Sequence, residues 1–262
     1  MNRLKISVIT VNLNNAEGLR KTIISVINQQ FSQLEFLVVD GGSTDESKKV
    51  MEQYSDKIHI AISEKDSGIY NAMNKGITKA TGDYFLFLNS GDILLGNNTL
   101  QQMLDGGDSA DLIFGDIKMS GLATSAIGLF PDQLSFKFFY INSLPHPCTL
   151  IRKQLFEHVG LYREDFKVAA DWAFFVLAVC KYNCSYKHLS LVVADFALGG
   201  ISSTSKKVID DEREAIYREH FPAFAGDYKE LFYLESELSQ AKKQIGYRIQ
   251  NKLKKIFAGS VN

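Results

Sequence analysis

Acidic residues follow four consecutive apolar segments of the chain, each beside glycine or serine. They stand in the stretches Asp40–Asp45, Glu64–Gly68, Asn89–Asp92 and Gly115–Asp116. If the apolar segments are parallel strands, their carboxyl ends share one edge of a sheet, where α/β proteins bind ligands. Carboxylates gathered there repel each other unless a cation lies among them, and a hard divalent cation that chelates a diphosphate would suit the site. A single aspartate at a strand end is more often a turn former or a helix cap, so only the repetition favours chemistry.

The segments that must position these acids alternate between strand and helix patterns. Short runs rich in β-branched and aromatic residues predict buried strands at Ile6–Val11, Glu35–Val39, Ile58–Ile62, Tyr84–Leu88 and Leu112–Phe114. Between these runs, apolar residues recur at helical spacing, as in Leu19, Ile23, Val26 and Ile27. The alternation predicts an α/β fold with a mostly parallel, Rossmann-like sheet flanked by helices.

The composition is that of a folded globular chain. Of 262 residues, 45% are hydrophobic and 23% are charged, and 29 Lys and Arg against 30 Asp and Glu leave a net charge of −1. This balance excludes a globally basic nucleic-acid-binding protein and an acidic disordered chain, so we expect no nucleic-acid partner. The 3 cysteines are too few for a disulfide scaffold, and the first apolar stretch has the pattern of a strand instead of a signal peptide. We therefore expect a cytoplasmic protein.

The second half of the chain is less regular, and no low-complexity linker separates it from the first. We expect strands at Leu122–Phe130 and Lys187–Phe196, and helices at Asp171–Tyr182 and Ser205–His220. Because no linker interrupts the sequence, residues 1–235 are predicted to form one fused domain.

Residues 236–262 form a tail of a different kind. Apolar residues from Leu238 to Ile256 recur at roughly helical spacing, and Ser236–Phe257 holds six basic residues against one acidic residue, Glu237. Such a basic amphipathic helix can lie on an anionic membrane surface. Packing on its own domain, or dimerisation with a second copy, explains the apolar stripe equally well, so these interpretations stay open.

Neither a P-loop nor a G-x-G-x-x-G motif occurs, so a P-loop enzyme and a dinucleotide dehydrogenase are not supported. Instead, ordered motifs run through VITVNLNN, EFLVVDGGSTDES, EKDSGIYNAMNKG and DYFLFLNSGD, and continue in LPHPCTLIRKQLF, VAADWAFFVL and FALGGISS. From about Lys5 to Ser203 the chain therefore resembles glycosyltransferase family 2, with its GT-A fold. It is most similar to bacterial members that build O-antigen, capsule or exopolysaccharide. The resemblance implies a nucleotide-sugar-binding half at 1–118 and an acceptor-binding half at 119–235.

The resemblance implies a donor site for a nucleoside-diphosphate sugar. Asp40 matches the strand-end acid that contacts the nucleotide base. The other positions that match the donor site, from the wall facing the base to the sugar and diphosphate segment, are Thr10, Val11, Asn12, Asp66, Asn74, Asn89, Ser90 and Gly91.

The resemblance also implies an inverting transfer, with Asp171 as general base and Asp92 as the ligand of a divalent cation, Mn²⁺ or Mg²⁺. The base would take the proton of the acceptor hydroxyl, while the cation would neutralise charge on the leaving diphosphate. Two positions of the fuller acidic motif carry Asn89 and Gly91 here, which leaves Asp92 as its one carboxylate. An amide oxygen can still coordinate a cation, and Mg²⁺ often needs one or two protein carboxylates beside the phosphates.

On the acceptor side, the resemblance points to His146, before Pro147, and we add Trp172, beside Asp171. A plain loop histidine and a core tryptophan are the structural alternatives. Gly199–Ser203 is interpreted as a hinge loop near the site. The implied acceptor is a saccharide or oligosaccharide carried on a polyprenyl-diphosphate lipid, which the basic tail would meet at the inner face of the cell membrane.

Two other functions remain open on sequence grounds. A sugar nucleotidyltransferase would use a related sheet, but it needs a glycine-rich, basic phosphate loop where Val11–Gly18 supplies mainly asparagine. A non-catalytic nucleotide-binding module would use the same acidic edge without turnover. If positive charge from the protein replaces the cation, Lys65 or Arg152 is the expected source.

Overall fold

The computed structural model describes residues 4–121, 125–197 and 206–258, with the side chains of the last helix described as far as Lys243 and at Ile245. The chain divides into two compact units, Met1–Arg213 and Glu214–Asn262. The first unit contains the sheet, and the division falls within helix α8 (Lys206–His220), before α9 (Pro222–Ala258). The predicted domain boundary between residues 235 and 236 stays a prediction.

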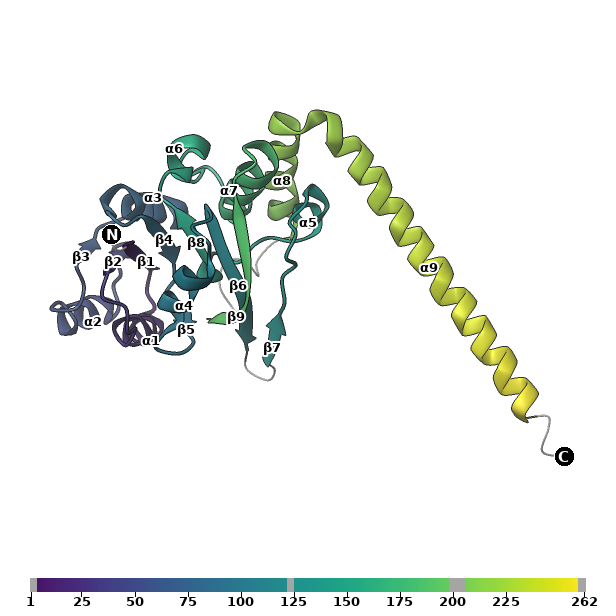
Figure 1. Cartoon of the computed structure of the whole chain (residues 1–262), viewed down its shortest axis with the longest axis horizontal. Coiled ribbons are helices and arrows are strands. Elements are labelled where there is room, and N and C mark those ends of the chain that lie inside the picture. The colour runs from purple at the N-terminus through teal and green to yellow at the C-terminus, as the bar shows by residue number, and fades with distance from the viewer. Residues whose placement is uncertain (1–3, 122–124, 198–205, 259–262) are drawn as a thin grey trace. The chain divides into compact units, whose positions relative to one another are not determined.

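A sheet of nine strands in the described residues forms the centre of the first unit (Figure 1). Its order is β3-β2-β1-β4-β8-β6-β9-β5, with β7 beside β6. Six strands run in one direction, and β5, β7 and β8 run against them. The strands are β1 (Ile6–Asn12), β2 (Leu34–Asp40), β3 (Ile60–Ser63), β4 (Tyr84–Phe87), β5 (Ile93–Leu94), β6 (Leu112–Ser120), β7 (Ser125–Gly128), β8 (Thr149–Arg152) and β9 (Tyr186–Ala197). The prediction of an α/β fold with a mostly parallel sheet is confirmed.

Helices lie on both faces of the sheet, with α1 and α2 on one side of β1 to β3 and α3 on the other (Figure 1). The predicted helix at Asp171–Tyr182 corresponds to α7 followed by the π-helical turn η2. Besides α8 and α9, the helical segments are α1 (Ala16–Ile27), α2 (Ser47–Gln53), α3 (Ile69–Lys79), α4 (Thr99–Gly106), α5 (Phe136–Ile141), the 3-10 turn η1 (His146–Cys148), α6 (Leu155–Val159), α7 (Ala170–Val176) and η2 (Leu177–Lys181).

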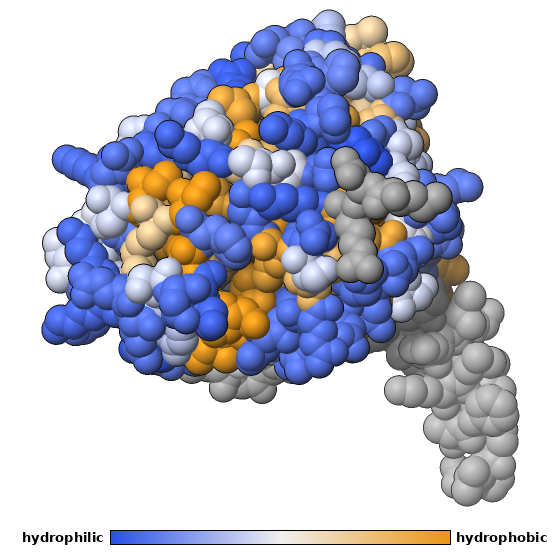
Figure 2. Space-filling view, turned by 60° about the vertical axis from the view of Figure 1, so that its left-hand side comes forward, coloured by the Kyte–Doolittle hydropathy of each residue, from blue (hydrophilic) through white to orange (hydrophobic). Residues whose placement is uncertain are grey.

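The alternation of side chains along the buried strands decides which helix each residue meets. Val8 belongs to the core cluster that includes Leu19 and Ile23 of α1. Its neighbour Ile9 faces α3, where a Cβ on Gly76 would come within 2.5 Å of Ile9 Cγ2. Glycine at this position therefore lets α3 pack directly on β1. The face of the molecule in Figure 2 is mostly hydrophilic, with apolar surface confined to patches, as expected when the apolar strands are enclosed.

Strand β6 continues beyond Phe114, where the sequence predicts its end, and its register with β9 shifts at Gly115 and Asp116. Asp116 consequently lies inside a strand, where its Oδ1 accepts a hydrogen bond from Phe130 N at 3.0 Å and lies 3.2 Å from His188 Nε2. The prediction that Asp116 joins the acids at the strand ends is wrong. Pairing with β7 and β9 extends the strand past a Gly-Asp sequence that alone favours a turn.

The later elements differ from the predictions mainly in their boundaries. The predicted strand Leu122–Phe130 contains β7, and its first three residues and the predicted hinge loop Gly199–Ser203 lie outside the described residues. Helix α9 begins at Pro222, well before the predicted Ser236, and proline suits a first helical position because it has no N–H to leave unpaired. Within the part of the chain that the structure describes, no helix has the length and apolarity needed to cross a membrane.

At the amino ends of the strands, the buried carboxylate of Glu35 ties three segments together. It accepts hydrogen bonds from Ser7 Oγ at 2.5 Å, from Thr81 N at 2.7 Å and from Lys5 Nζ at 2.9 Å. Burial by itself would raise the pKa of Glu35, but these hydrogen bonds outweigh it and lower the pKa from 4.5 to about 2. The ionised carboxylate therefore stabilises the fold at neutral pH.

We expect Glu35→Gln to remove a pH-dependent part of the stability. Because the pKa of Glu35 is about 2 in the folded chain and 4.5 when unperturbed, its contribution is complete above pH 4.5 and is lost as the pH falls toward 2. Between pH 6 and pH 3, the free energy of unfolding of the wild type should fall by about 2 kcal/mol more than that of the variant. Urea denaturation at both pH values measures this difference, with Glu52→Gln, an exposed glutamate of α2, as the control. An identical pH dependence in the wild type and Glu35→Gln would contradict the account.

Candidate active site

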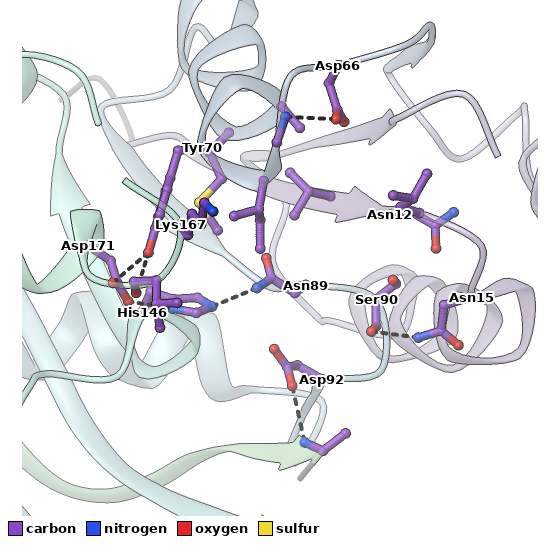
Figure 3. Close-up of a pocket in the computed structure, with 18 of the residues that line it drawn as sticks. Asn12, Asn15, Asp66, Tyr70, Asn89, Ser90, Asp92, His146, Lys167 and Asp171 are labelled. Atoms are coloured by element: carbon purple, nitrogen blue, oxygen red, sulfur yellow. Dashed lines mark hydrogen bonds and ion pairs between the residues drawn. The ribbon is translucent and has the colours of Figure 1, made fainter. Parts of the chain in front are cut away.

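A cavity of about 550 Å³ lies at the carboxyl ends of β1 and β4 (Figure 3). Its walls come from β1, the loop after β4, the start of α3, η1, the first turn of α7 and the end of β9. The sequence-predicted site residues that line it are Val11, Asn12, Asp66, Asn89, Ser90, Asp92, His146 and Asp171.

Asn12, the last residue of β1, is held by Asp40, its register partner on β2. The Asp40 carboxylate accepts hydrogen bonds from Asn12 Nδ2 and Ser63 Oγ, both at 2.8 Å, and from Ser43 N at 3.0 Å. Burial raises the pKa of Asp40, but these hydrogen bonds outweigh it and lower the pKa below the usual range. Asp40 is fully buried behind the cavity wall, whereas Asn12 lines the cavity and its Oδ1 has no hydrogen-bond partner among the described residues.

The loop from Asn89 to Asp92 is fixed by helix α1. Thr22 Oγ1 donates to the carbonyl oxygen of Asp92 at 2.7 Å and accepts from Gly91 N at 2.9 Å. Asn15, the N-cap of α1, donates from Nδ2 to the carbonyl oxygen of Ser90 at 3.0 Å. Gly91 has a φ of +110°, a conformation that other L-residues rarely adopt. The backbone geometry at this position therefore suits glycine.

Asp92 presents an unsatisfied carboxylate oxygen in this loop. The residue is 3% exposed; its Oδ1 accepts a hydrogen bond from Ala197 N at 3.2 Å, and its Oδ2 has no partner among the described residues. Burial raises the pKa of Asp92 to about 6, and the nearby His146 opposes part of that rise. Asn89 Oδ1 is also buried without a described partner, and both residues line the cavity. Unpaired carboxylate and amide oxygens are the ligands that Mg²⁺ and Mn²⁺ prefer, so these two residues fit a divalent cation.

The segment before Asp171 is fixed by a glutamate from a later helix. Glu212 of α8 accepts hydrogen bonds from three successive backbone N–H groups, at 2.6 Å from Lys167, 3.1 Å from Val168 and 2.8 Å from Ala169. These donors precede the first turn of α7, where backbone N–H groups otherwise lack partners. The carboxylate therefore sets the place where α7 begins, and Asp171 in its first turn lines the cavity.

Neighbouring polar groups hold the Asp171 carboxylate from both sides. Its Oδ1 accepts a hydrogen bond from Trp172 N at 2.9 Å and lies 3.1 Å from the Tyr70 hydroxyl, whose single proton is shared with the Val168 carbonyl oxygen at 2.6 Å. Its Oδ2 lies 3.1 Å from His146 Nδ1, and His146 Nε2 lies 3.0 Å from Asn89 Nδ2 (Figure 3). Burial and the nearby Asp171 raise the pKa of Tyr70 well above its usual value, so this hydroxyl remains a donor. A row of polar contacts thus runs from Tyr70 through Asp171 and His146 to Asn89.

Asp66 and Asn12 lie at the end of the cavity away from Asp171 (Figure 3). Asp66 Oδ1 accepts a hydrogen bond from Gly68 N at 3.1 Å, and a Cβ at Gly41 would clash with the Asp66 carboxylate. Glycine after Asp40 is therefore what allows the loops that follow β2 and β3 to meet.

Several predicted site residues lie behind the cavity wall. Thr10 is fully buried, and Asn74 joins α3 to Tyr162, donating from Nδ2 to the Tyr162 carbonyl oxygen at 2.8 Å. Trp172 is 2% exposed, and its indole N–H donates to the carbonyl oxygen of Phe139 at 2.8 Å. The expected stacking of Trp172 on an acceptor sugar does not fit this geometry, because the ring is enclosed in the core.

Lys65 and Arg152 do not line the cavity, although the sequence names them as alternative sources of positive charge. Arg152 instead forms an ion pair with Asp111, with Nε 3.3 Å from Oδ1. The cavity contains a different cation, Lys167, which precedes Asp171 by four residues. Sequence reasoning also missed Tyr70, because nothing local shows that its hydroxyl reaches a carboxylate 101 residues later.

Comparison with known proteins identifies the family. Residues 7–160 match the model of Glycosyl transferase family 2. A PGL/p-HBAD biosynthesis glycosyltransferase of Mycobacterium bovis is 31% identical over 214 residues, which cover 79% of this chain and 81% of that protein. An uncharacterized glycosyltransferase of Mycobacterium tuberculosis is 31% identical over 204 residues, which cover 76% of this chain and 77% of that protein.

Solved structures share the fold. S. aureus TarS 1–349 in complex with UDP-GlcNAc aligns with a TM-score of 0.66 and 23% identity, over 82% of this chain and 66% of that chain. A longer TarS structure is covered over 39% of its length. The mannosyltransferase PcManGT from Pyrobaculum calidifontis, in complex with GDP-Man and Mn²⁺, aligns with a TM-score of 0.56 and 16% identity, over 75% of this chain and 58% of that chain. The expected GT-A fold is confirmed.

The family match begins in β1 and extends through β8 to the end of α6, so it includes the loop that carries Asp92. The mycobacterial relatives extend the similarity to more than three quarters of this chain. The ordered motifs, the fold and these relatives agree: the chain belongs to glycosyltransferase family 2, and the protein is a glycosyltransferase.

Proposed function

We propose that the protein transfers a sugar from a nucleoside-diphosphate sugar to a hydroxyl group of a saccharide acceptor, with inversion at the anomeric carbon. The observation that carries this proposal is that the cavity, besides Asp66 at its far end, brings together two carboxylates in different surroundings, Asp92 and Asp171. Asp92 offers an oxygen without a described partner, whereas neighbouring polar groups hold both oxygens of Asp171. The nucleotidyltransferase and binding-module alternatives are not retained, because the family is one of glycosyltransferases.

The nucleotide is proposed to bind at the end of the cavity formed by Asn12 and Asp66. Asn12 Oδ1 suits an N–H group of the base, since it is a buried acceptor without a described partner. The expected contact of Asp40 with the base does not fit its full burial, so we assign Asp40 a supporting role: it accepts from Asn12 Nδ2, which leaves the amide oxygen for the ligand. The solved relatives give support, because TarS binds UDP-GlcNAc and PcManGT binds GDP-Man.

A divalent cation, Mn²⁺ or Mg²⁺, is proposed to bind at Asp92, with Asn89 as a second oxygen ligand. When bound, it would supply positive charge that stabilises the leaving diphosphate. The described residues contain no group of three or more His, Cys, Asp or Glu side chains placed to hold a metal ion. We therefore expect the donor phosphates and water to complete the coordination, as is common for Mg²⁺. The Mn²⁺ bound to PcManGT supports the choice of ion.

Asp171 is proposed to act as the general base. The acceptor oxygen forms its bond to the anomeric carbon as the bond between that carbon and the diphosphate oxygen breaks, and the hydroxyl proton passes to the Asp171 carboxylate. Because Glu212 fixes the start of α7 and Tyr70 binds Asp171 Oδ1, the base is oriented before the acceptor arrives.

The acceptor is proposed to be a saccharide on a polyprenyl-diphosphate lipid, in the synthesis of a bacterial surface polysaccharide such as O-antigen or capsule. Support comes from α9, where Leu238 and Ile245 are 54% and 57% exposed on a helix that also contains Lys242 and Lys243. The sequence places four more basic residues in the last turns of that helix, from Arg248 to Lys255. Such a helix would bind anionic lipids and hold a cytoplasmic enzyme at the inner face of the cell membrane. A homodimer formed through the same apolar residues is the alternative.

Asp171→Asn should abolish turnover without weakening donor binding. An amide cannot accept the hydroxyl proton, so kcat should fall by about 100-fold or more. Release of nucleoside diphosphate measures turnover, and calorimetry with the free nucleotide measures binding. Asp165→Asn, at an exposed carboxylate in the same segment, is the matched control. Near-normal kcat in Asp171→Asn would remove Asp171 as the base.

Asp92→Asn should uncouple nucleotide binding from the cation. Calorimetric titration of UDP, GDP, dTDP and CMP, each with and without Mn²⁺, should show one nucleoside diphosphate that binds more tightly with the metal in the wild type. In Asp92→Asn, the gain in nucleotide affinity that Mn²⁺ produces should be about tenfold smaller, because the charged ligand is gone. Asp116→Asn, at a buried carboxylate outside the cavity, should behave like the wild type. Equal metal dependence in wild type and Asp92→Asn would place the cation elsewhere.

Vesicle binding tests the role proposed for α9. The full chain should sediment with vesicles that contain anionic lipid and much less with neutral phosphatidylcholine, and rising salt should weaken the binding. Replacing Lys252, Lys254 and Lys255 by Glu should remove the binding, whereas replacing exposed Lys48, Lys49 and Lys57 should not. Absence of vesicle binding together with a dimeric mass in light scattering would favour association between two copies.

A further inference from the structure

His146 contacts both the proposed general base and the loop proposed to bind the cation. Its Nδ1 lies 3.1 Å from Asp171 Oδ2, and its Nε2 lies 3.0 Å from Asn89 Nδ2 (Figure 3). Asp171 is the proposed base, and Asn89 opens the loop that ends in Asp92. The His146 side chain is 14% exposed, so these contacts are largely shielded from competing water.

The partners of the ring determine where its proton lies. An ionised carboxylate only accepts hydrogen bonds, so His146 Nδ1 must carry a proton to bond with Asp171. In a neutral ring Nε2 is then an acceptor, and the Asn89 amide supplies the donor that it needs. Both contacts are satisfied at once by the neutral Nδ1–H tautomer.

Two prolines and two hydrogen bonds fix the backbone around His146. The residue begins the 3-10 turn η1, which follows Pro145 and includes Pro147, and the turn is closed by Cys148 N donating to the Pro145 carbonyl oxygen at 3.1 Å. Thr149 Oγ1 donates to the same carbonyl at 2.9 Å. The imidazole is therefore presented from a segment with little conformational freedom, which suits it to hold another side chain in place.

We propose that His146 is the positioning residue of the base: its Nδ1–H fixes the orientation of Asp171, and its Nε2 ties that orientation to Asn89. This inference rests on the proposed role of Asp171. Oδ1 of Asp171 already contacts Trp172 N and Tyr70, whereas Oδ2 contacts only the ring among the described residues. Without His146, rotation about the last bond of the Asp171 side chain loses its second restraint. The base would then spend less time aligned with the acceptor hydroxyl, which affects kcat more than donor binding.

Two isosteric substitutions separate the two contacts of the ring. In His146→Asn the side-chain amide lies near the position of Nδ1, so it can still donate to Asp171. In His146→Gln the amide lies near the position of Nε2, so it can still contact Asn89 but no longer reaches Asp171. We expect His146→Asn to retain kcat within about tenfold and His146→Gln to lose about 100-fold, with the donor KM little changed in both. His158→Asn, at an exposed histidine of α6, is the control. Equal losses in the Asn and Gln variants, or a loss confined to KM, would overturn the proposal.

A spectroscopic test needs no substrate and separates this inference from the proposed function. In ¹⁵N-histidine-labelled protein, which has 5 histidines, the signal missing from His146→Asn assigns this ring. Its ¹⁵N shifts should show the neutral Nδ1–H tautomer in the wild type. A wild-type ring protonated at Nε2 would overturn the positioning role even if the transferase activity were demonstrated. If the ring shows the expected tautomer but the protein releases nucleoside diphosphate from none of the nucleotide sugars, the contact between His146 and Asp171 would still stand. That result would count against the proposed function.

Discussion

The parallel alignment of β1 between β2 and β4 is the constraint on which the site depends. It places Asn12 opposite Asp40 and ends β4 just before Asn89, so polar residues from three strands meet at one edge of the sheet. The backbone reinforces this arrangement, because Ser90 N donates to the Val11 carbonyl oxygen at 3.0 Å and Gly41 N donates to the Asn12 carbonyl oxygen at 2.9 Å. A slip of one residue in either pairing would turn these side chains to the other face of the sheet.

Three buried carboxylates have different roles in the structure, which depend on how many hydrogen bonds each of them accepts. Glu35 and Asp40 are saturated with hydrogen-bond donors, so their pKa values fall despite burial and both act as structural anchors. Asp92 has one hydrogen-bonded oxygen and one oxygen without a described partner, and its pKa rises to about 6. Burying a carboxylate with one oxygen unpaired costs stability unless a ligand supplies the missing positive charge. This difference in hydrogen bonding, more than the presence of an acid, is the reason why we propose Asp92 as the binding group.

Local sequence patterns were enough to predict the first strands and the α/β class, and eight of the 13 site residues expected from the sequence and its family resemblance line the cavity. Apolar runs such as Tyr84–Leu88 are long and continuous, and the residues that follow them carry the motifs. The pattern failed where distant segments decide the outcome. β8 runs against its neighbours between β4 and β6, and Asp116 lies inside β6 because β7 and β9 pair with that strand. Tyr70 enters the site only because α3 packs beside the segment that leads into α7, which no local spacing reveals.

The most direct test of the account is a crystal structure of the protein with an intact nucleotide sugar and Mn²⁺, using the nucleotide that binds most tightly. The account predicts that the base lies near Asn12, that the diphosphate and metal lie at Asp92, and that Asp171 faces the anomeric carbon from the side opposite the diphosphate. A donor bound outside this cavity, or an Asp171 carboxylate on the same side of the anomeric carbon as the diphosphate, would contradict it.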